Sequence, residues 1–356
     1  MKSRNSKIIV LLLLIGLFLT GCGKKEESDI KKPSNDNQTE QTDIKKLKIV
    51  DENSKTRPYA VMINNISVAR PLQSGLQDAY LMYEIIVEGG ITRYMALFMG
   101  QNTTRIGSIR SARHYFLDYA LENDAIYVHH GQSPQAQSDF SALGVDRIVV
   151  DNSKTGWRDK SLNVASEHTL FTSIEKLNNG LGSKRTTRNN NLLLNYSVDE
   201  IDMANLDGAA SATNISIPYS NSYVTSYTYD AENGYYLRSV NGKAHTDYVT
   251  KKQYHFKNII TYQVKNTTLN DGENKGRQNI ENVGSGTGYY ISGGYSVPIK
   301  WEKQSRKSQT KYYYMNGEEL KVNDGNTFIQ IYPKTGDLTI TPKVEEVTTE
   351  GNNIIQ

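Results

Sequence analysis

A single cysteine, Cys22, occurs in the 356 residues of this chain. One thiol excludes an internal disulfide framework and a cysteine-based zinc site, and its place near the N-terminus excludes a catalytic thiol in the body of the chain. The sequence also contains no Ser-His-Asp spacing, no P-loop and no glycine-rich dinucleotide fingerprint. We therefore expect no cofactor and none of the common nucleophilic or nucleotide-binding activities.

The chain also has almost no net charge. The chain has 41 Lys and Arg against 38 Asp and Glu, a formal net charge of +3. Lys2, Arg4 and Lys7 precede Cys22 with no acid among them, so the remainder of the chain is neutral (3 − 3 = 0). Nucleic-acid binding along a protein surface depends on a net positive charge, which this body lacks. Any cationic site must therefore be local.

The N-terminal segment has the pattern of a bacterial lipoprotein signal peptide. A positively charged start is followed by the apolar run Ile8 to Leu19, which is too short to span a bilayer comfortably. The run ends in Leu19-Thr20-Gly21-Cys22, with small residues before the cysteine. We predict that residues 1–21 are removed and that Cys22 carries a diacylglyceryl group and a further acyl chain such as palmitate. The alternatives are an uncleaved N-terminal anchor or a chance cysteine.

Composition divides the rest of the chain into four segments. Residues 22–47 are rich in Lys, Glu, Asp, Ser, Asn and Gln and predict a disordered tether. A flexible chain of this length has a root-mean-square reach of roughly 25–30 Å. We expect an α/β domain over residues 48–205, a β-rich domain over residues 206–346 and a tail over residues 347–356. The lipid would hold both domains at the extracytoplasmic face of the cell membrane.

The first domain alternates apolar runs with helical periods. Predicted strands are Tyr59–Ile66, Ile91–Met99, Ala125–His130 and Arg147–Val150, and predicted helices are Ser111–Leu121 and Ser133–Leu143. Leu76–Tyr83 is open between a short helix and a strand, and Thr104–Ile109 between a strand and a turn. Strands that alternate with helices of this size indicate an α/β or α+β fold with a mixed sheet.

The second domain has frequent Tyr and Thr, no helical periodicity and recurring Asn-Gly and Asp-Gly turns. This pattern predicts antiparallel strands, among them Tyr235–Val240, Ile259–Val264, Tyr312–Met315 and Thr327–Tyr332. We expect the glycine-rich stretch Gly284–Gly294 to form turns. Val297–Lys303 reads as an edge strand protected by lysines, or alternatively as a site where Trp301 and nearby cations bind a sugar or an anionic polymer.

Three arginines stand close together in the segment Thr104–Phe116, which reads TRIGSIRSARHYF. If Ser111 caps a helix, Arg105, Arg110 and Arg113 surround its first turn, and Ser108 and Ser111 add neutral donors. Such an arrangement suits a phosphate or a carboxylate, because backbone N–H groups at a helix start also attract anions. The alternative is that the arginines form structural ion pairs with Glu84, Glu88 or Asp118.

Two further pairs of polar residues lie near this segment in the predicted fold. His129 and His130 end a strand whose carboxyl end should lie beside the arginines, and adjacent strand residues face opposite ways, so at most one points into a shared site. Glu84 and Glu88 are spaced for acid–base or cation chemistry, or they neutralise the arginines. No spacing suggests a third metal ligand, so we predict no metal site.

The residues also resemble a known family. The resemblance lies in RPYAVMINN (57–65), ARPLQSGLQDAYLMYEIIVEGGITRYMALF (69–98), RIGSIRSAR (105–113), Val297–Lys303 and NDGNTFIQ (323–330). These segments are similar to the YerB-like bacterial lipoproteins, and they extend over both predicted domains. The resemblance implies a cell-surface lipoprotein with two domains of unknown function.

A fainter similarity concerns the LytR-CpsA-Psr proteins, which attach cell-wall glycopolymers from polyprenyl pyrophosphate carriers. It implies that Asp78 is a magnesium-binding carboxylate and that Arg110 binds pyrophosphate. That family has Pro-Arg-Asp where this chain has Ile109-Arg110-Ser111, so the second carboxylate is missing. Metal-assisted transfer needs both acids.

Taken together, the sequence predicts a lipid-anchored envelope protein that binds rather than catalyses. Its ligand would carry phosphate or carboxylate groups, as a cell-wall polymer or a polyprenyl phosphate does. Two alternatives belong to other classes. One is a cell-wall glycopolymer phosphotransferase of LytR-CpsA-Psr type, and the other is a scaffold whose β-rich domain binds an envelope protein.

Overall fold

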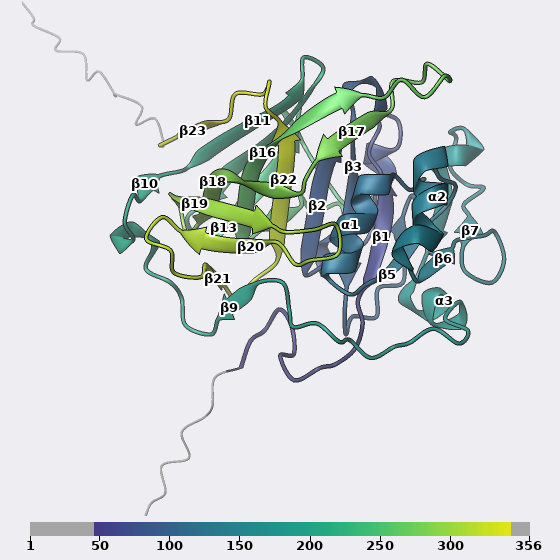
Figure 1. The fold of residues 1–356 in the computed structure, drawn as a ribbon, viewed down its shortest axis with the longest axis horizontal. Helices are drawn as coiled ribbons and strands as arrows, with labels where there is room; N and C mark the ends of the chain where they lie inside the picture. Colours follow the sequence, from purple (N-terminus) through teal and green to yellow (C-terminus); the bar gives the residue numbers. More distant parts are fainter. Residues whose placement is uncertain (1–45, 343–356) are drawn as a thin grey trace, which may run out of the picture. The chain divides into compact units, whose positions relative to one another are not determined.

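The computed structural model describes residues 46–342, which form a body dominated by strands (Figure 1). The predicted signal peptide, Cys22, nearly all of the tether and the tail lie outside the described residues. Within the described part of the chain, no helix combines the length and the hydropathy that a membrane span requires.

Twelve strands form one mixed sheet. Its main path is β10 (Ala210–Ser211), β19 (Tyr295–Lys303), β18 (Gly284–Ser292), β16 (Asn258–Thr268), β22 (Thr327–Pro333), β2 (Leu81–Ile86), β3 (Thr92–Phe98), β1 (Tyr59–Asn64), β5 (Ile126–His129) and β6 (Arg147–Val149). β17 (Gln278–Glu281) pairs with β16, and β20 (Lys311–Tyr314) pairs with β19. The parallel pair β2–β22 joins strands from both predicted domains into this single sheet.

A second, antiparallel sheet of six strands comes from the C-terminal half of the body. Its strands are β14 (Lys243–Ala244), β13 (Tyr235–Val240), β12 (Tyr223–Asp230), β11 (Asn214–Ser220) and β23 (Thr339–Thr341), with β15 (His255–Phe256) on β13. Two small sheets complete the described strands: β4 (Ile106–Gly107) with β8 (Leu170–Thr172) and β7 (Trp157–Arg158), and β9 (Asn195–Ser197) with β21 (Lys321–Asn323). Short 3-10 turns occur at Arg70–Leu72, Leu76–Asp78, Glu88–Gly90, Ser166–His168 and Met203–Asn205.

Three α-helices lie among the strands of the N-terminal half: α1 (His114–Glu122), α2 (Pro134–Leu143) and α3 (Ile174–Asn179). α2 has the bounds that the sequence predicts. The Ser133 hydroxyl accepts a hydrogen bond from the Ala136 N–H, Pro134 occupies the first turn, and Gly144 ends the helix in the left-handed conformation. α2 connects β5 to β6, which pair in parallel, so this part of the fold is a βαβ unit.

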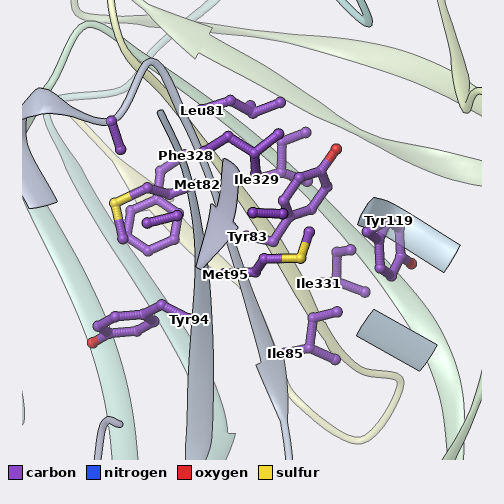
Figure 2. Close-up of a cluster of buried hydrophobic side chains, with 14 of the residues drawn as sticks. Leu81, Met82, Tyr83, Ile85, Tyr94, Met95, Tyr119, Phe328, Ile329 and Ile331 are labelled. Atoms are coloured by element: carbon purple, nitrogen blue, oxygen red, sulfur yellow. The ribbon is translucent and has the colours of Figure 1, made fainter. Parts of the chain in front are cut away.

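The core of the body lies on both faces of β2, β3 and β22 (Figure 2). On one face, the rings of Tyr83 on β2 and Tyr119 on α1 pack with centroids 5.0 Å apart. On the other face, Phe328 packs edge-on against Tyr94 and against Tyr227 of the second sheet. Successive residues of a strand point to opposite faces of the sheet. These wholly buried strands therefore pack against the helices on one face and against the six-stranded sheet on the other.

The predicted fold class is confirmed in its main features. The twelve-stranded sheet is mixed and the second sheet is antiparallel. The balance between helix and strand was wrong, because the described residues hold only three α-helices, of nine, ten and six residues. The start of α1 also differs from the prediction. Ala112 donates its N–H to the carbonyl of Gly131 in an extended conformation, so the helix begins at His114 and Ser111 does not cap it.

Two predictions for the C-terminal half were wrong. The stretch expected to form turns is mostly the strand β18, in which Gly286 makes room for a cross-strand neighbour: a Cβ there would lie 2.8 Å from the Trp301 indole nitrogen. β19 is not an edge strand, because it pairs with β18 on one side and with β10 and β20 on the other. Lys303, expected to protect an edge, is buried instead.

Candidate functional site

The three arginines that were expected to form one anion site lie in separate environments. The guanidinium of Arg105 lies 2.9 Å from the Asp159 carboxylate, and its Cζ is 3.7 Å from the centroid of the Phe171 ring. Arg113 binds both carboxylate oxygens of Glu88 through Nε and Nη2. Although burial opposes the charge of Glu88, the hydrogen bond and charge of Arg113 lower the pKa of this carboxyl. Two of the three arginines are therefore matched by acids; Glu88 is among the partners that the structural alternative names, and Asp159 is not.

Arg110 has a different environment, near the 3-10 turn Ser166–His168. Its Nη1 donates to the Glu167 carbonyl at 3.2 Å, and its Nη2 lies 3.5 Å from the Glu167 carboxylate. Arg158 on β7 reaches the same turn, where its Nη1 donates to the Ser166 carbonyl. The side chain of Glu167 is 57% exposed, so its pairing with Arg110 is a weak surface contact. Arg110 and Arg158 are thus half-buried and contact adjacent residues of one turn.

Two histidines complete this arrangement. His130 Nδ1 lies 2.7 Å from the Val150 carbonyl, so Nδ1 carries the proton and Nε2 accepts from Arg158 Nη2 at 3.3 Å. His168 Nδ1 accepts from the Asn64 amide at 3.0 Å, which leaves Nε2 to donate to Glu167 at 3.2 Å. Burial lowers the pKa of His168. We call these residues the Arg110–Arg158 group: Arg110, His130, Arg158, Glu167 and His168.

A second cluster of positive charge lies close to this group. Arg93 on β3 donates to the Ser111 carbonyl at 2.6 Å, and its Nη2 is 3.7 Å from the Glu88 carboxylate that also binds Arg113. Burial lowers the pKa of Arg93, and the nearby charges of Arg113 and Arg110 contribute to this shift, although a guanidinium keeps its proton in proteins. Arg93 and Arg113 therefore share Glu88, Arg110 pairs with Glu167 and Arg158 contacts no acid, so these four arginines exceed their two acids by two positive charges.

His129 does not join this region. Its ring is buried and stacks on Phe140 of α2 with centroids 5.0 Å apart, away from His130. Nδ1 lies 2.8 Å from the Gly131 carbonyl, so Nδ1 carries the proton, and Nε2 lies 3.4 Å from the guanidinium of Arg147. This environment holds His129 in its neutral form and gives it a packing role.

The imidazole of His129 should titrate at an unusually low pH, because burial lowers its pKa to about 4. The unfolded chain has a histidine pKa of about 6.5. Between these values the unfolded state binds more protons, so the contribution of His129 to stability is complete above about pH 6.5 and is lost as the pH falls toward 4. Imidazole NMR shifts followed against pH measure this directly, with the signal assigned by its loss in His129→Gln. A midpoint near 6.5 would contradict the buried, neutral ring.

The predicted acidic residues are placed elsewhere. Glu84 is fully buried in an ion pair with Arg238, and Asp78 accepts from the Thr103 hydroxyl at 2.7 Å, ahead of β2. Arg110 donates its N–H to Met62 near the carboxyl end of β1, which is remote in register from Asp78. Ser108 is buried with an unpartnered hydroxyl. Within residues 46–342, no three His, Cys, Asp or Glu side chains gather in a way that could hold a metal ion.

Sequence reasoning missed most partners of Arg110. Arg158, Glu167 and His168 come from the segment around β7 and β8, which carries no motif and reaches Arg110 only through the small sheet β4–β8–β7. Arg93 was visible within a predicted strand, but its partners depend on the register of β1 and β3. A charged residue inside an apolar strand was the available signal for Arg93, since such a residue is rarely buried without a partner.

Comparison with known proteins identifies relatives of the chain. The models for the protein of unknown function DUF3048 match it, with the N-terminal domain at residues 46–188 and the C-terminal domain at residues 215–329. A Bacillus subtilis (strain 168) protein named "Putative lipoprotein YerB" is 30% identical over 293 residues, which cover 81% of this chain and 84% of that protein. The crystal structure of YerB protein from Bacillus subtilis matches with a TM-score of 0.68 and 28% identity, over 80% of this chain and 94% of that one. The predicted resemblance to the YerB-like family is confirmed, whereas these matches lend no support to the similarity with LytR-CpsA-Psr proteins.

Proposed function

Because the chain belongs to the DUF3048 family and contains both of its domains, we propose that it is a lipid-anchored protein of the bacterial envelope that binds an anionic envelope component at the Arg110–Arg158 group. The component carries phosphate or carboxylate groups, as cell-wall polymers and polyprenyl phosphates do. The observation that carries the proposal is the excess of two positive charges in this region, whereas the chain from Cys22 onward has no net charge.

The anchor rests on the N-terminal sequence. A basic start, the apolar run Ile8 to Leu19 and small residues before Cys22 form a lipoprotein signal, and the name of the Bacillus subtilis relative agrees with it. A lipid on Cys22 and the tether place the cationic group within reach of membrane-linked and wall-linked anions. Binding there would occur at the extracytoplasmic face.

The Arg110–Arg158 group suits a phosphate or a carboxylate for three reasons. Each arginine uses some of its N–H donors on backbone carbonyls of the 3-10 turn, which fixes the guanidinium planes while other donors remain available. His130 accepts a hydrogen bond from Arg158 and His168 donates one to Glu167, so the two rings orient an arginine and the acid of the group. The sole acid in the group, Glu167, is exposed and can turn away from Arg110 when an anion arrives.

Titration of the full-length protein in non-ionic detergent with inorganic pyrophosphate tests this function. In the double variant Arg110→Gln/Arg158→Gln, the affinity measured by calorimetry should fall about 100-fold, because each lost charge-assisted hydrogen bond contributes about 1.5–3 kcal/mol. The affinity of the unchanged protein should also decrease steeply with added salt.

The matched control is Lys184→Gln/Arg185→Gln, which removes the same formal charge from another loop and should leave the affinity unchanged. Thermal unfolding of both double variants verifies that they fold. If a folded Arg110→Gln/Arg158→Gln protein binds pyrophosphate as tightly as the unchanged protein, the proposed function is wrong at this group.

A further inference from the structure

A hollow of about 330 Å³ opens on the surface between residues 67–71 and the hairpin of β13 and β14. Its walls include the apolar side chains of Pro71, Val240 and Ala244. Two cations, Arg70 and Lys243, also line it, and none of its lining residues is an acid. The hollow is separate from the Arg110–Arg158 group, since the two share no residue.

Hydrogen bonds fix the guanidinium of Arg70 along one of its edges and leave the other edge without a partner among the described residues. Nε donates to the side-chain oxygen of Asn65 and Nη2 to its backbone carbonyl, both at 3.1 Å. The Cζ atom lies 5.2 Å from the centroid of the Tyr223 ring, which further fixes the plane. Nη1 makes no hydrogen bond and Arg70 makes no ion pair within the described residues. A half-buried arginine oriented in this way has donors available for a ligand.

Lys243 brings a second positive charge to the hollow from β14. Its side chain is exposed and forms no ion pair with any described residue. The hairpin that carries it is fastened by Asn241, whose side chain accepts from the Val224 N–H and donates to the Ser222 carbonyl, both at 2.8 Å. Asn241 and Gly242 adopt the left-handed conformation that such a two-residue turn requires. The positive charge of Lys243 is therefore carried by a β-hairpin whose turn is fixed by hydrogen bonds.

The floor of the hollow supplies no opposing charge. It is formed by His245, whose Nδ1 accepts from Arg238 Nη1 at 2.6 Å, so Nε2 carries the proton and donates to Gln73. Burial and the charges of Arg238 and Arg70 lower the pKa of His245, which keeps the ring neutral. The buried acids Glu84 and Asp247 do not line the hollow: Arg238 and the hydroxyls of Thr92 and Tyr223 bind Glu84, and the Gly75 N–H and the Tyr254 hydroxyl bind Asp247.

We propose that this hollow binds a small organic carboxylate that has an apolar body. Arg70 and Lys243 bind the carboxylate, and Pro71, Val240 and Ala244 enclose the body. A volume of about 330 Å³ lies at the lower end of the range for small-molecule sites and excludes a polymer as the buried part of the ligand. None of the residues that line the hollow belongs to the Arg110–Arg158 group, so this proposal does not depend on the function proposed above.

The test uses 4-fluorobenzoate with the full-length protein in non-ionic detergent, followed by broadening of the ligand's ¹⁹F NMR line. We expect saturable binding, and we expect 4-fluorobenzyl alcohol, which has the same ring without the charge, to bind at least about tenfold more weakly. Arg70→Gln should reduce the affinity for 4-fluorobenzoate by about tenfold or more. Lys243→Gln should reduce it about threefold, and because Lys243 is exposed this variant remains informative if Arg70→Gln does not fold.

Lys252→Gln is the matched control, since it removes an exposed lysine from the segment after the hairpin and outside the hollow. It should bind 4-fluorobenzoate like the unchanged protein. Equal affinity for the alcohol and the carboxylate would overturn the proposal, as would a folded Lys243→Gln protein with unchanged affinity. Because Arg110 and Arg158 are intact in all these variants, pyrophosphate binding should persist, which separates this test from that of the proposed function.

Discussion

Replacing Glu84 by glutamine should lower the free energy of unfolding by about 3–5 kcal/mol, because the change leaves a buried charge without its partner. The side chains of Glu84 and Arg238 are fully buried, with Arg238 Nη2 2.8 Å from the carboxylate. The two residues lie on β2 and β13, so the pair fastens the six-stranded sheet to the twelve-stranded sheet. Arginine does not release its proton at accessible pH, so the loss should be the same at about pH 7 and about pH 9.

Urea unfolding followed by circular dichroism measures this loss. Thr225→Val is a matched control at the same carboxylate: it removes the hydrogen bond that the hydroxyl donates to Glu84 at 3.1 Å and the one that it accepts from Arg238 at 3.0 Å, and it should cost about 2 kcal/mol. The double variant Glu84→Met/Arg238→Met removes both charges and should recover much of the stability. A loss below about 1 kcal/mol for Glu84→Gln would show that the pair does not hold the sheets together.

Replacing Glu122 by glutamine should produce a loss of similar size, about 3–5 kcal/mol near neutral pH, with a different dependence on pH. Glu122 ends α1 and Lys303 ends β19, and both side chains are buried with Nζ 2.7 Å from the carboxylate. The Thr310 hydroxyl at 2.6 Å and the Tyr83 hydroxyl at 2.6 Å also donate to Glu122. In the variant, a buried lysine remains without a counter-charge, and lysine can release its proton.

The loss caused by Glu122→Gln should therefore shrink as the pH rises from about 7 toward 10, because the neutral amine is tolerated in an apolar environment. The sign follows from linkage: the folded variant binds fewer protons than its unfolded chain in this range, so its stability increases with pH relative to the unchanged protein. Urea unfolding at a series of pH values measures the difference. If Glu122→Gln lowers the free energy of unfolding by the same amount up to about pH 10, the variant does not contain a buried, unpaired lysine. Glu84→Gln is the control, because its loss of stability should not depend on pH.

These two ion pairs clarify which cations of the protein remain available for ligands. The buried charges of Arg238 and Lys303 each have an acid in contact and hold secondary-structure elements together. Arg113 and Arg105 also have acids, Glu88 and Asp159. Arg158 and Arg70 form no ion pair within the described residues, and the acid beside Arg110 is exposed at the surface. Among these arginines, those with no acid in contact or with only an exposed one are the ones that line the two proposed sites.

Local patterns in the sequence were sufficient for much of the N-terminal half. The apolar runs that become β1, β3 and β5 and the Ser-Pro start and Gly end of α2 are read directly from neighbouring residues. The start of α1 could not be read in this way. The N–H of Ala112 donates to the Gly131 carbonyl, which keeps Ala112 extended, and this hydrogen bond depends on how distant segments of the chain pack. β18 was missed for the same reason, since Gly286 is required by Trp301 on one neighbouring strand and Gly288 by the backbone of Thr261 on the other.

Only two members of the Arg110–Arg158 group could be predicted from the sequence. The arginine-rich segment pointed to Arg110, and the strand after α1 pointed to His130. The remaining members, Arg158, Glu167 and His168, belong to a segment without periodicity or motif, and it is placed by pairing of β8 with β4. Whether a given arginine meets an acid or solvent is decided by such long-range pairings, so the sequence left both outcomes open for Arg105, Arg110 and Arg113.

Anomalous diffraction from crystals of the protein soaked in tungstate, an anion with the shape of phosphate, shows whether the Arg110–Arg158 group binds an anion. We expect a tungsten peak within hydrogen-bond distance of the guanidinium groups of both Arg110 and Arg158, with the Glu167 carboxylate displaced from Arg110. Tungstate bound elsewhere on the protein, with the Arg110–Arg158 group empty and Glu167 still in place, would contradict this expectation.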